Sequence, residues 1–195
     1  MADDSKQQAK CEQNASNLVW IDIETTGLDM DAHHIIEIAV LITDSELNVI
    51  AEGPELVIHL DDDKLSKMNE WCQQNHAKSG LTTKVKQSQI DMAAAEAQVL
   101  QFIKQYVPAK TSPLCGNSIH IDKKFIEKDM PKLAAFLHYR LIDVTTLKEL
   151  CRRWYPVVLQ QCPKKKKTHR AMSDIIESID ELKYYRSKIF VNLDK

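Results

Sequence analysis

The stretch VWIDIETTGL (Val19–Leu28) is an apolar run interrupted by two acids, as in a buried β-strand. Side chains two residues apart in a strand point to the same face. Asp22 and Glu24 therefore share one face, roughly 6–7 Å apart along the strand, while Val19, Ile21 and Ile23 share the other. Burying like charges this close together costs several kcal/mol unless a partner compensates them. We therefore expect Asp22 and Glu24 to have a functional role that offsets this cost.

Length and composition indicate one globular domain. The chain has 195 residues, of which 44% are hydrophobic and 28% charged, with four glycines and six prolines. This is enough chain to bury a full core, and the composition is neither fibrous nor disordered. No run approaches 18 uncharged apolar residues, so no association with a membrane is expected. The formal net charge of −2 favours a very short polyanionic ligand, which needs only a local basic cluster, over a long one.

The ends and the cysteines indicate an intracellular protein. The five cysteines are scattered and never spaced as CxxC, which favours reduced thiols over a disulfide framework or a zinc site. Residues 1–17 contain acids, no arginine and no apolar stretch, unlike a secretory signal or a mitochondrial presequence. We expect a flexible tail over 1–17, a folded domain over 18–192 and a cytoplasmic location.

The hydrophobic pattern predicts strands first and then alternating helices and strands. A mixed stretch at 63–76 is helical in part, and Thr146 with Glu149 matches a capping box. Residues 156–167, with prolines at positions 156 and 163, are expected to form a loop. The predicted strands cover 18–24, 35–43, 55–60, 112–117 and 138–144, and the clearer helices cover 92–106, 119–130, 146–154 and 171–190. This order indicates a single α/β domain with a mixed β-sheet flanked by α-helices.

Two further acids, Asp122 and Asp174, lie beside the core-facing side of their predicted helices. If these acids gather with Asp22 and Glu24, the four carboxylates repel one another and their pKa values rise. A divalent cation reverses the sign of that interaction, and hard oxygen ligands suit Mg²⁺ or Mn²⁺. The sequence therefore predicts a metal site built from these four residues.

His169 precedes Asp174 by five residues, and imidazole is suited to take a proton from water near neutral pH. Carboxylates that hold two metal ions, together with a nearby base, are the components needed to hydrolyse a phosphodiester. Taken one at a time, these residues have simpler explanations. Asp22 and Glu24 could form a solvated strand face, Asp174 could pair with Arg170, and His169 could cap a helix. Their appearance together and in order favours catalysis.

The motifs DIETTGL, GNSIHIDKKF and HRAMSDI resemble those of the DEDDh branch of the RNase H-like 3′-to-5′ exonucleases. Within that branch the chain resembles the oligoribonuclease family from about Leu18 to Phe190, through WID, IIEIAVLITD, MNEWCQQNH, LHYRLIDVTTLKELCRRWYP and ESIDELKYYR. The resemblance implies an RNase H-like fold and a homodimer. It also implies hydrolysis of very short RNA, chiefly dinucleotides, to mononucleotides with two Mg²⁺ or Mn²⁺ ions. Because relatives also work in mitochondria, that location stays open.

The same resemblance implies residues that bind the substrate. Leu28 would lie between the two bases, and Trp71 and His76 would line the base and phosphate pocket. The 5′-terminal phosphate would be held by Ser118, Arg140 and Thr145, with Tyr139 supplied by the partner subunit. A closed 5′ end would act as a length ruler, because it leaves a longer strand no exit.

The chain departs from the family pattern at a few positions. It reads ETTGL where EMTGL is common, HRAMSD where HRALDD is common, and Thr145 where serine is usual. None of these changes removes a ligand or the base, but two alternatives remain. One is an exonuclease of the same branch that acts on longer RNA or single-stranded DNA, and the other is a non-catalytic RNA-binding dimer scaffold. The run Lys164–Lys167 is either a solvated loop or a clamp for RNA phosphates.

Overall fold

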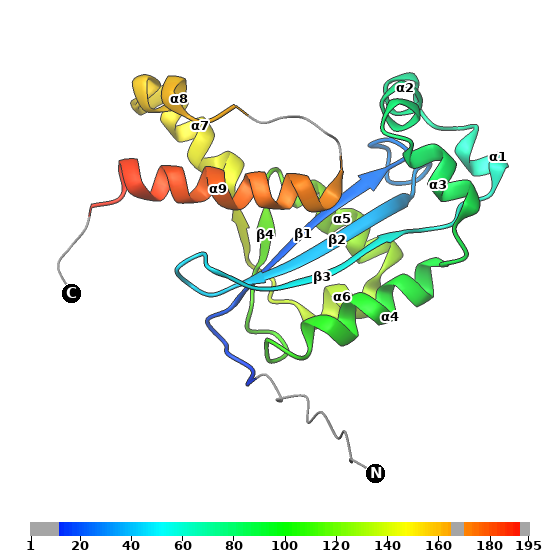
Figure 1. Ribbon diagram of the computed structural model, residues 1–195, viewed down its shortest axis with the longest axis horizontal. Coiled ribbons are helices and arrows are strands. Elements are labelled where there is room, and N and C mark those ends of the chain that lie inside the picture. Colours follow the sequence, from blue (N-terminus) through cyan, green and yellow to red (C-terminus); the bar gives the residue numbers. More distant parts are fainter. Residues whose placement is uncertain (1–11, 165–169, 192–195) are drawn as a thin grey trace, which may run out of the picture.

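The computed structural model describes residues 12–164 and 170–191. A five-stranded mixed sheet with strand order β3-β2-β1-β4-β5 forms its centre (Figure 1). β1, β2 and β3 are antiparallel neighbours, whereas β4 and β5 run parallel to β1. The strands are β1 (Leu18–Thr25), β2 (Ile35–Thr43), β3 (Val49–Val57), β4 (Leu114–Gly116) and β5 (Leu141–Asp143). The expected mixed sheet is confirmed.

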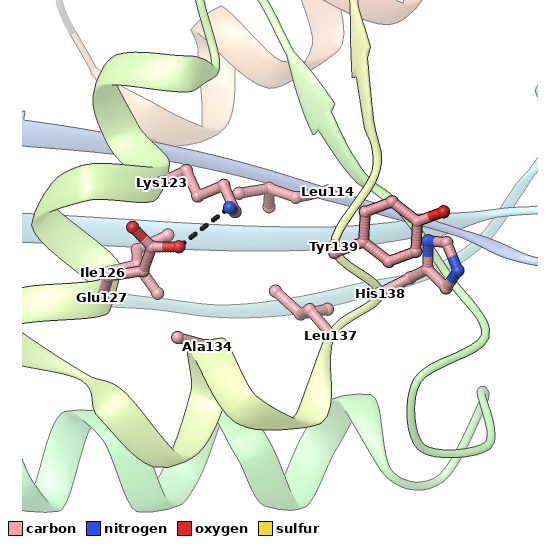
Figure 2. Close-up of a pocket in the computed structure, with 8 residues that line it drawn as sticks. All are labelled: Leu114, Lys123, Ile126, Glu127, Ala134, Leu137, His138 and Tyr139. Carbon is pink, nitrogen blue, oxygen red and sulfur yellow. Dashed lines mark ion pairs between the residues drawn. The ribbon is translucent and has the colours of Figure 1, made fainter.

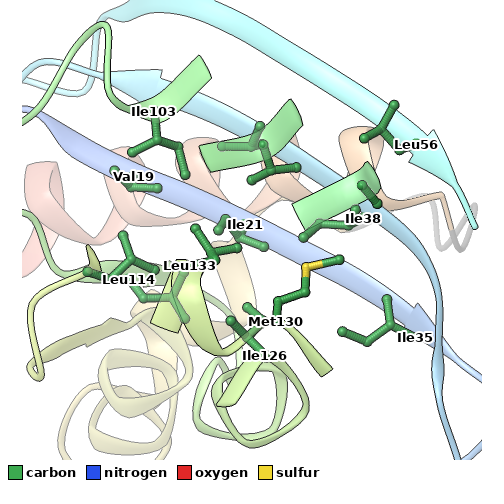
Figure 3. Close-up of a cluster of buried hydrophobic side chains, with 14 of the residues drawn as sticks. Val19, Ile21, Ile35, Ile38, Leu56, Ile103, Leu114, Ile126, Met130 and Leu133 are labelled. Atoms are coloured by element: carbon green, nitrogen blue, oxygen red, sulfur yellow. The ribbon is translucent and has the colours of Figure 1, made fainter. Parts of the chain in front are cut away.

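Helices cover both faces of this sheet, which explains why β2 is buried along its whole length. One face carries Val19 and Ile21 into a core formed with α4 (Met92–Ile103), α5 (His120–Asp129) and α6 (Pro131–Phe136) (Figure 3). The other face carries Trp20 into a core formed with α7 (Val144–Trp154), α8 (Pro156–Gln161) and α9 (Ala171–Ile189). By alternation, Asp22 and Glu24 belong to this second face, which α9 crosses (Figure 1).

Three short helices form a separate group at the end of the sheet where β1 finishes (Figure 1). They are α1 (Asp62–Leu65), α2 (Glu70–Lys78) and α3 (Leu81–Gln87). The predicted helix over 63–76 is interrupted, because Asn69 ends the intervening turn and caps α2 by accepting the backbone N–H of Cys72 at 2.8 Å. The N–H of Asn69 donates to the carbonyl of Thr26, 3.3 Å away. This contact ties α2 to the loop that follows β1.

Other boundaries also differ from the sequence prediction. Helix α7 begins at Val144 rather than at a capping box at Thr146, because Asp143 caps it by accepting the N–H of Thr145 at 3.0 Å. Glu149 instead forms ion pairs with the two arginines that follow it. The expected loop after Trp154 contains α8, which starts at Pro156, a residue suited to a first helical turn. The third strand is Val49–Val57 rather than 55–60, and α3 was not expected.

The expected tail, residues 1–17, is described only from residue 12. The N–H of Asn14 and the side-chain amide of Asn17 both donate to the carbonyl of Tyr106 at 3.0 Å, just beyond α4. Asn17 is buried. The chain is therefore attached to the domain ahead of β1. Among the described helices, none is long and apolar enough to cross a membrane.

Candidate active site

Three of the predicted acids converge where β1 meets the start of α9. The side chains of Asp22, Glu24 and Asp174 each offer a carboxylate oxygen, and these oxygens lie within 4.8 Å of one another. Asp22 and Glu24 come from β1, and Asp174 comes from the first turn of α9. Asp174 is 150 positions from Glu24 in the chain. Such a group of hard oxygen donors is suited to a divalent cation.

The fourth acid, Asp122, comes from a separate helix. It lies in the first turn of α5, and its Oδ1 accepts the backbone N–H of Ile23 at 3.1 Å, between the two acids of β1. Among the described residues, the group within 4.8 Å contains Asp22, Glu24 and Asp174, and Asp122 lies outside it. Asp122 still lines the same pocket. It therefore holds the acidic segment of β1 while facing the site.

The pocket beside these acids has a volume of about 440 Å³. Its rim carries two of the predicted substrate residues, Leu28 and Trp71, whose exposed fractions are 68% and 56%. Exposed apolar and aromatic side chains beside a charged centre are suited to stack against nucleobases. The lining comprises Asp22, Ile23, Glu24, Thr25, Leu28, Asn69, Trp71, Cys72, Ile121, Asp122 and Phe125.

His76 lies beneath this pocket rather than in its lining. Its exposed fraction is 0%. Its Nε2 is 2.9 Å from the carbonyl oxygen of Thr25, and its Nδ1 is 4.0 Å from a carboxylate oxygen of Glu24. This burial separates His76 from the exposed Leu28 and Trp71, and its role in the base and phosphate pocket stays a prediction. Its contacts make it a support for the end of β1 and for Glu24.

The electrostatics of the site favour a bound cation. Burial, followed by the nearby charges of Asp174, Glu37 and Asp122, raises the pKa of the Glu24 carboxyl to about 8. Burial likewise raises the pKa of Asp122 to about 7, although its hydrogen bond from Ile23 acts in the opposite direction. A divalent ion would remove the repulsion that produces part of these shifts. The donor set therefore fits the metal that the sequence predicted.

Glu37 and Arg170 complete the site and were not predicted. Glu37 pairs with Glu24 across β1 and β2 and is fully buried. Arg170 places its Nη2 2.8 Å from Glu37 and 2.7 Å from Glu55, and the N–H of Ala171 donates to Glu37 at 3.2 Å. A lone acid in the apolar run IIEIAVLIT was the available signal in the sequence. An ion pair between Arg170 and Asp174 was the simpler alternative explanation of Asp174, whereas the structure pairs Arg170 with these two glutamates.

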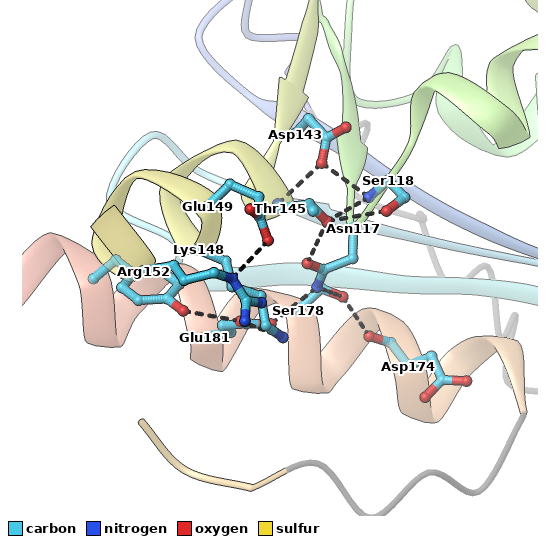
Figure 4. A network of polar contacts seen from close by, with 11 residues as sticks. Asn117, Ser118, Asp143, Thr145, Lys148, Glu149, Arg152, Asp174, Ser178 and Glu181 are labelled. Atoms are coloured by element: carbon cyan, nitrogen blue, oxygen red, sulfur yellow. Dashed lines mark hydrogen bonds and ion pairs between the residues drawn. The ribbon is translucent and has the colours of Figure 1, made fainter. Parts of the chain in front are cut away.

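His169 lies outside the described residues, as do Lys165–Lys167 of the lysine run. Of the residues expected at the 5′-phosphate, Ser118 and Thr145 are adjacent. The N–H of Ser118 donates to the Thr145 hydroxyl at 2.8 Å and to Asp143 at 2.9 Å (Figure 4). These two residues connect the end of β4 to the start of α7.

Tyr139 and Arg140 lie side by side just before β5. The guanidinium carbon of Arg140 is 5.4 Å from the centre of the Tyr139 ring. Tyr139 has an exposed fraction of 71% and lines a different, smaller hollow beside the ion pair of Lys123 and Glu127 (Figure 2). Within one copy of the chain, its ring therefore lies at a different hollow from Asp22 and Glu24.

Comparisons with known proteins match the chain to exonucleases. A family model described as exonuclease matches residues 19–182. The chain is 53% identical over 179 residues to a Homo sapiens protein named mitochondrial oligoribonuclease, covering 92% of this chain and 76% of that one. It is 54% identical over 177 residues to an oligoribonuclease of Aeromonas hydrophila, covering 91% and 97% respectively.

A solved structure shows the same fold. The complex of E. coli exonuclease I with single-stranded DNA superposes with a TM-score of 0.70 at 18% identity, covering 91% of this chain and 41% of that one. The chain thus spans about two fifths of exonuclease I, and at this identity the likeness concerns the fold alone. The expected RNase H-like sheet flanked by helices in a single domain is confirmed.

Proposed function

The chain belongs to the oligoribonuclease family and is a metal-dependent 3′-to-5′ exoribonuclease, and we propose that its substrates are very short RNAs, chiefly 5′-phosphorylated dinucleotides. The observation that carries this proposal is the group of carboxylate oxygens from Asp22, Glu24 and Asp174 beside the exposed side chains of Leu28 and Trp71. Acids that attract cations and an apolar rim that contacts bases are both suited to cleaving an oligonucleotide.

We assign the metal site to Asp22, Glu24, Asp122 and Asp174, with Mg²⁺ or Mn²⁺ as its ions. When bound, two such ions stabilise the charge that develops on the attacking and leaving oxygens of the phosphodiester. Burial, followed by the charges of Asp174, Glu37 and Asp122, raises the pKa of Glu24, so a bound cation would offset the repulsion that Glu24 experiences. Asp122, already bonded to Ile23, would contribute from the edge of the group.

His169 is proposed as the general base. It is bonded in the chain to Arg170, whose ion pairs with Glu37 and Glu55 fix the start of α9. The histidine would take a proton from water as the water oxygen attacks the scissile phosphorus. The bond from phosphorus to the 3′ oxygen breaks, and the departing oxygen is protonated to give a 3′-hydroxyl and a released mononucleotide.

Substrate binding is proposed to use both ends of a dinucleotide. Leu28 would separate the bases and Trp71 would stack on one of them, which the exposure of both side chains supports. Ser118, Arg140 and Thr145 would hold the 5′-phosphate. His76 is assigned the support of Glu24 from beneath the pocket.

A homodimer would bring Tyr139 to the site. Within one chain the exposed Tyr139 lines a separate hollow, so its proposed role requires a second copy. Sedimentation at micromolar concentration is expected to show the mass of a dimer. A monomer with full activity would refute both the dimer and the role of Tyr139. The cytoplasmic location stays a prediction, because mammalian relatives are named as mitochondrial.

A length series tests the proposed function. Turnover of 5′-phosphorylated dinucleotides is compared with that of seven-mers and twenty-mers of RNA and single-stranded DNA, with Mg²⁺, with Mn²⁺ and with a chelator. We expect metal-dependent cleavage that is fastest on the RNA dinucleotide. Equal rates at all lengths would favour an exonuclease for longer strands. Absence of cleavage with either metal would favour a non-catalytic RNA-binding scaffold.

A further inference from the structure

Asn117, the first residue after β4, forms hydrogen bonds in two opposite directions (Figure 4). Its Oδ1 accepts the hydroxyl of Thr145 at 3.2 Å. Its Nδ2 donates to the hydroxyl of Ser178 at 2.7 Å and to a carboxylate oxygen of Glu181 at 3.2 Å. Since a carboxylate only accepts, the amide nitrogen must face α9 and the amide oxygen must face α7. The side chain of Asn117 therefore joins the start of α7 to α9.

On the α7 side, this amide continues into a rigid turn. The hydroxyl of Thr145 also accepts the N–H of Ser118, which has a left-handed backbone conformation with φ of 51°. That conformation is unfavourable for a residue with a side chain and needs surrounding contacts to hold it. Asp143 supplies them by accepting the N–H groups of both Ser118 and Thr145. The two hydroxyl residues thus form one fixed unit.

On the α9 side, the amide reaches the helix that carries a candidate metal ligand. The hydroxyl of Ser178 donates to the backbone carbonyl of Asp174, one turn earlier, at 2.7 Å. Glu181 is held in turn by Lys148 at 3.4 Å and by the hydroxyl of Tyr185 at 3.2 Å. Ser178, Glu181 and Tyr185 are all buried, so the α9 end of this link is buried. Buried and fully bonded polar networks are rigid.

We propose that Asn117 is a positioning residue that sets the distance between the 5′-phosphate site and the carboxylates that act on the scissile bond. The inference rests on the proposed function, because it takes Ser118 and Thr145 as the residues that bind the 5′-phosphate. A continuous series of hydrogen bonds runs from these residues through Asn117 and Ser178 to Asp174. If the distance between the 5′-phosphate site and the carboxylates is fixed, a substrate with one internucleotide linkage can reach both sites at once. A longer substrate cannot, so it is cleaved less well.

The test measures kcat and KM for three RNAs in the full-length protein: a 5′-phosphorylated dinucleotide, the same dinucleotide with a 5′-hydroxyl, and a 5′-phosphorylated seven-mer. We expect Asn117→Ala to lower kcat/KM on the phosphorylated dinucleotide about tenfold, the size expected for the loss of one hydrogen bond. Its effect on the 5′-hydroxyl dinucleotide should be small. Two ratios of kcat/KM should therefore both decrease: that of the phosphorylated to the 5′-hydroxyl dinucleotide, and that of the phosphorylated dinucleotide to the seven-mer.

Two further variants separate positioning from general weakening. Ser178→Ala breaks the same link from α9 and must narrow both preferences in the same way, which keeps the test decisive if Asn117→Ala does not fold. Tyr185→Phe removes a hydroxyl from the same network but leaves the link intact, so it should keep both preferences. The inference would be overturned, with the proposed function intact, by either of two results. One is an equal loss of kcat/KM on all three RNAs, and the other is unchanged preferences in both Asn117→Ala and Ser178→Ala. A wild-type protein without preference for the phosphorylated dinucleotide would overturn the proposed function first.

Discussion

The guanidinium of Arg170 lies 2.8 Å from the carboxylate of Glu37. Glu37 is fully buried and lies directly opposite Glu24 on the neighbouring strand. This ion pair connects the residue before α9 to the central strands, and the N–H of Ala171 donates to the same carboxylate. The cation of Arg170 also lowers the pKa of Glu24, against the stronger effects of burial and neighbouring acids. The pair thus anchors the helix that carries Asp174 and partly balances the charge of the site.

Replacement of Arg170 by alanine should lower the free energy of unfolding by about 3 kcal/mol, because it leaves the charge of Glu37 buried without its main partner. The matched control is Arg186→Ala, which breaks the exposed pair of Arg186 with Glu46 and should cost at most about 1 kcal/mol. Urea unfolding of both variants measures the difference. Equal losses would contradict the anchoring role. Arg170→Lys should restore only part of the stability, since lysine lacks the planar fork that contacts both glutamates.

The stability of the metal-free protein should fall as pH rises from about 4.5 to about 8. The pKa of Glu24 is raised from 4.5 to about 8 in the folded state, so in this window the folded state binds more protons than the unfolded state. The stabilisation is fully present below the unfolded pKa and lost as pH rises through the folded one. The loss is on the order of 5 kcal/mol, and Asp122, with its pKa raised to about 7, acts in the same direction.

Urea unfolding with chelator across this pH range measures that slope. Glu24→Gln should reduce this slope, because glutamine does not titrate, and should leave the part due to Asp122. Addition of Mg²⁺ or Mn²⁺ at pH 8 should raise the stability of the wild type and have less effect on the variant. A wild-type protein whose stability is flat or rises over this pH range would contradict the proposed repulsion.

Asp174→Asn should lower the cleavage rate more than about 100-fold, since even the loss of a group that only hydrogen-bonds a metal ligand costs about 10- to 100-fold. Without metal, this variant should be as stable as the wild type or more so, because it removes one charge from a crowded group. Asp180→Asn, at an exposed position of the same helix, is the matched control and should retain both rate and stability. Normal cleavage by Asp174→Asn would remove it from the catalytic machinery.

Glu96, which lies on α4, caps the N-terminus of α6. Its Oε1 accepts the N–H groups of Lys132 at 2.6 Å and Leu133 at 3.1 Å. Glu96→Ala should lower the free energy of unfolding by about 2 kcal/mol, the cost of leaving buried donors at a helix start without an acceptor. Glu96→Gln keeps an acceptor oxygen and should cost less. Thermal or urea unfolding measures both, and dinucleotide turnover well below the midpoint should not change. Equal effects of the two variants would show that the cap contributes little.

Much of the fold could be predicted from local patterns. The apolar run of β2 and the spaced apolar residues of α9 follow the periods of a buried strand and an amphipathic helix, so their positions agree with the prediction within about a residue. The ends of elements were less predictable. Asn69 and Asp143 decide where α2 and α7 begin, and many polar residues nearby could have capped them equally well.

The sequence by itself determined that β1 presents Asp22 and Glu24 on one face, because the period of a strand is local. It could also suggest their association with Asp122 and Asp174 from the chemistry of metal ions and from the resemblance of the motifs. Only the tertiary structure decided that Asp174 joins the group while Asp122 holds the edge of β1, and that His76 is buried beneath Glu24. Likewise, only the tertiary structure brings Arg170 into contact with Glu37, which is 133 positions away in the sequence. The physical reason is that such contacts depend on how α9, α5 and α2 pack against the sheet, and no short-range pattern encodes that packing.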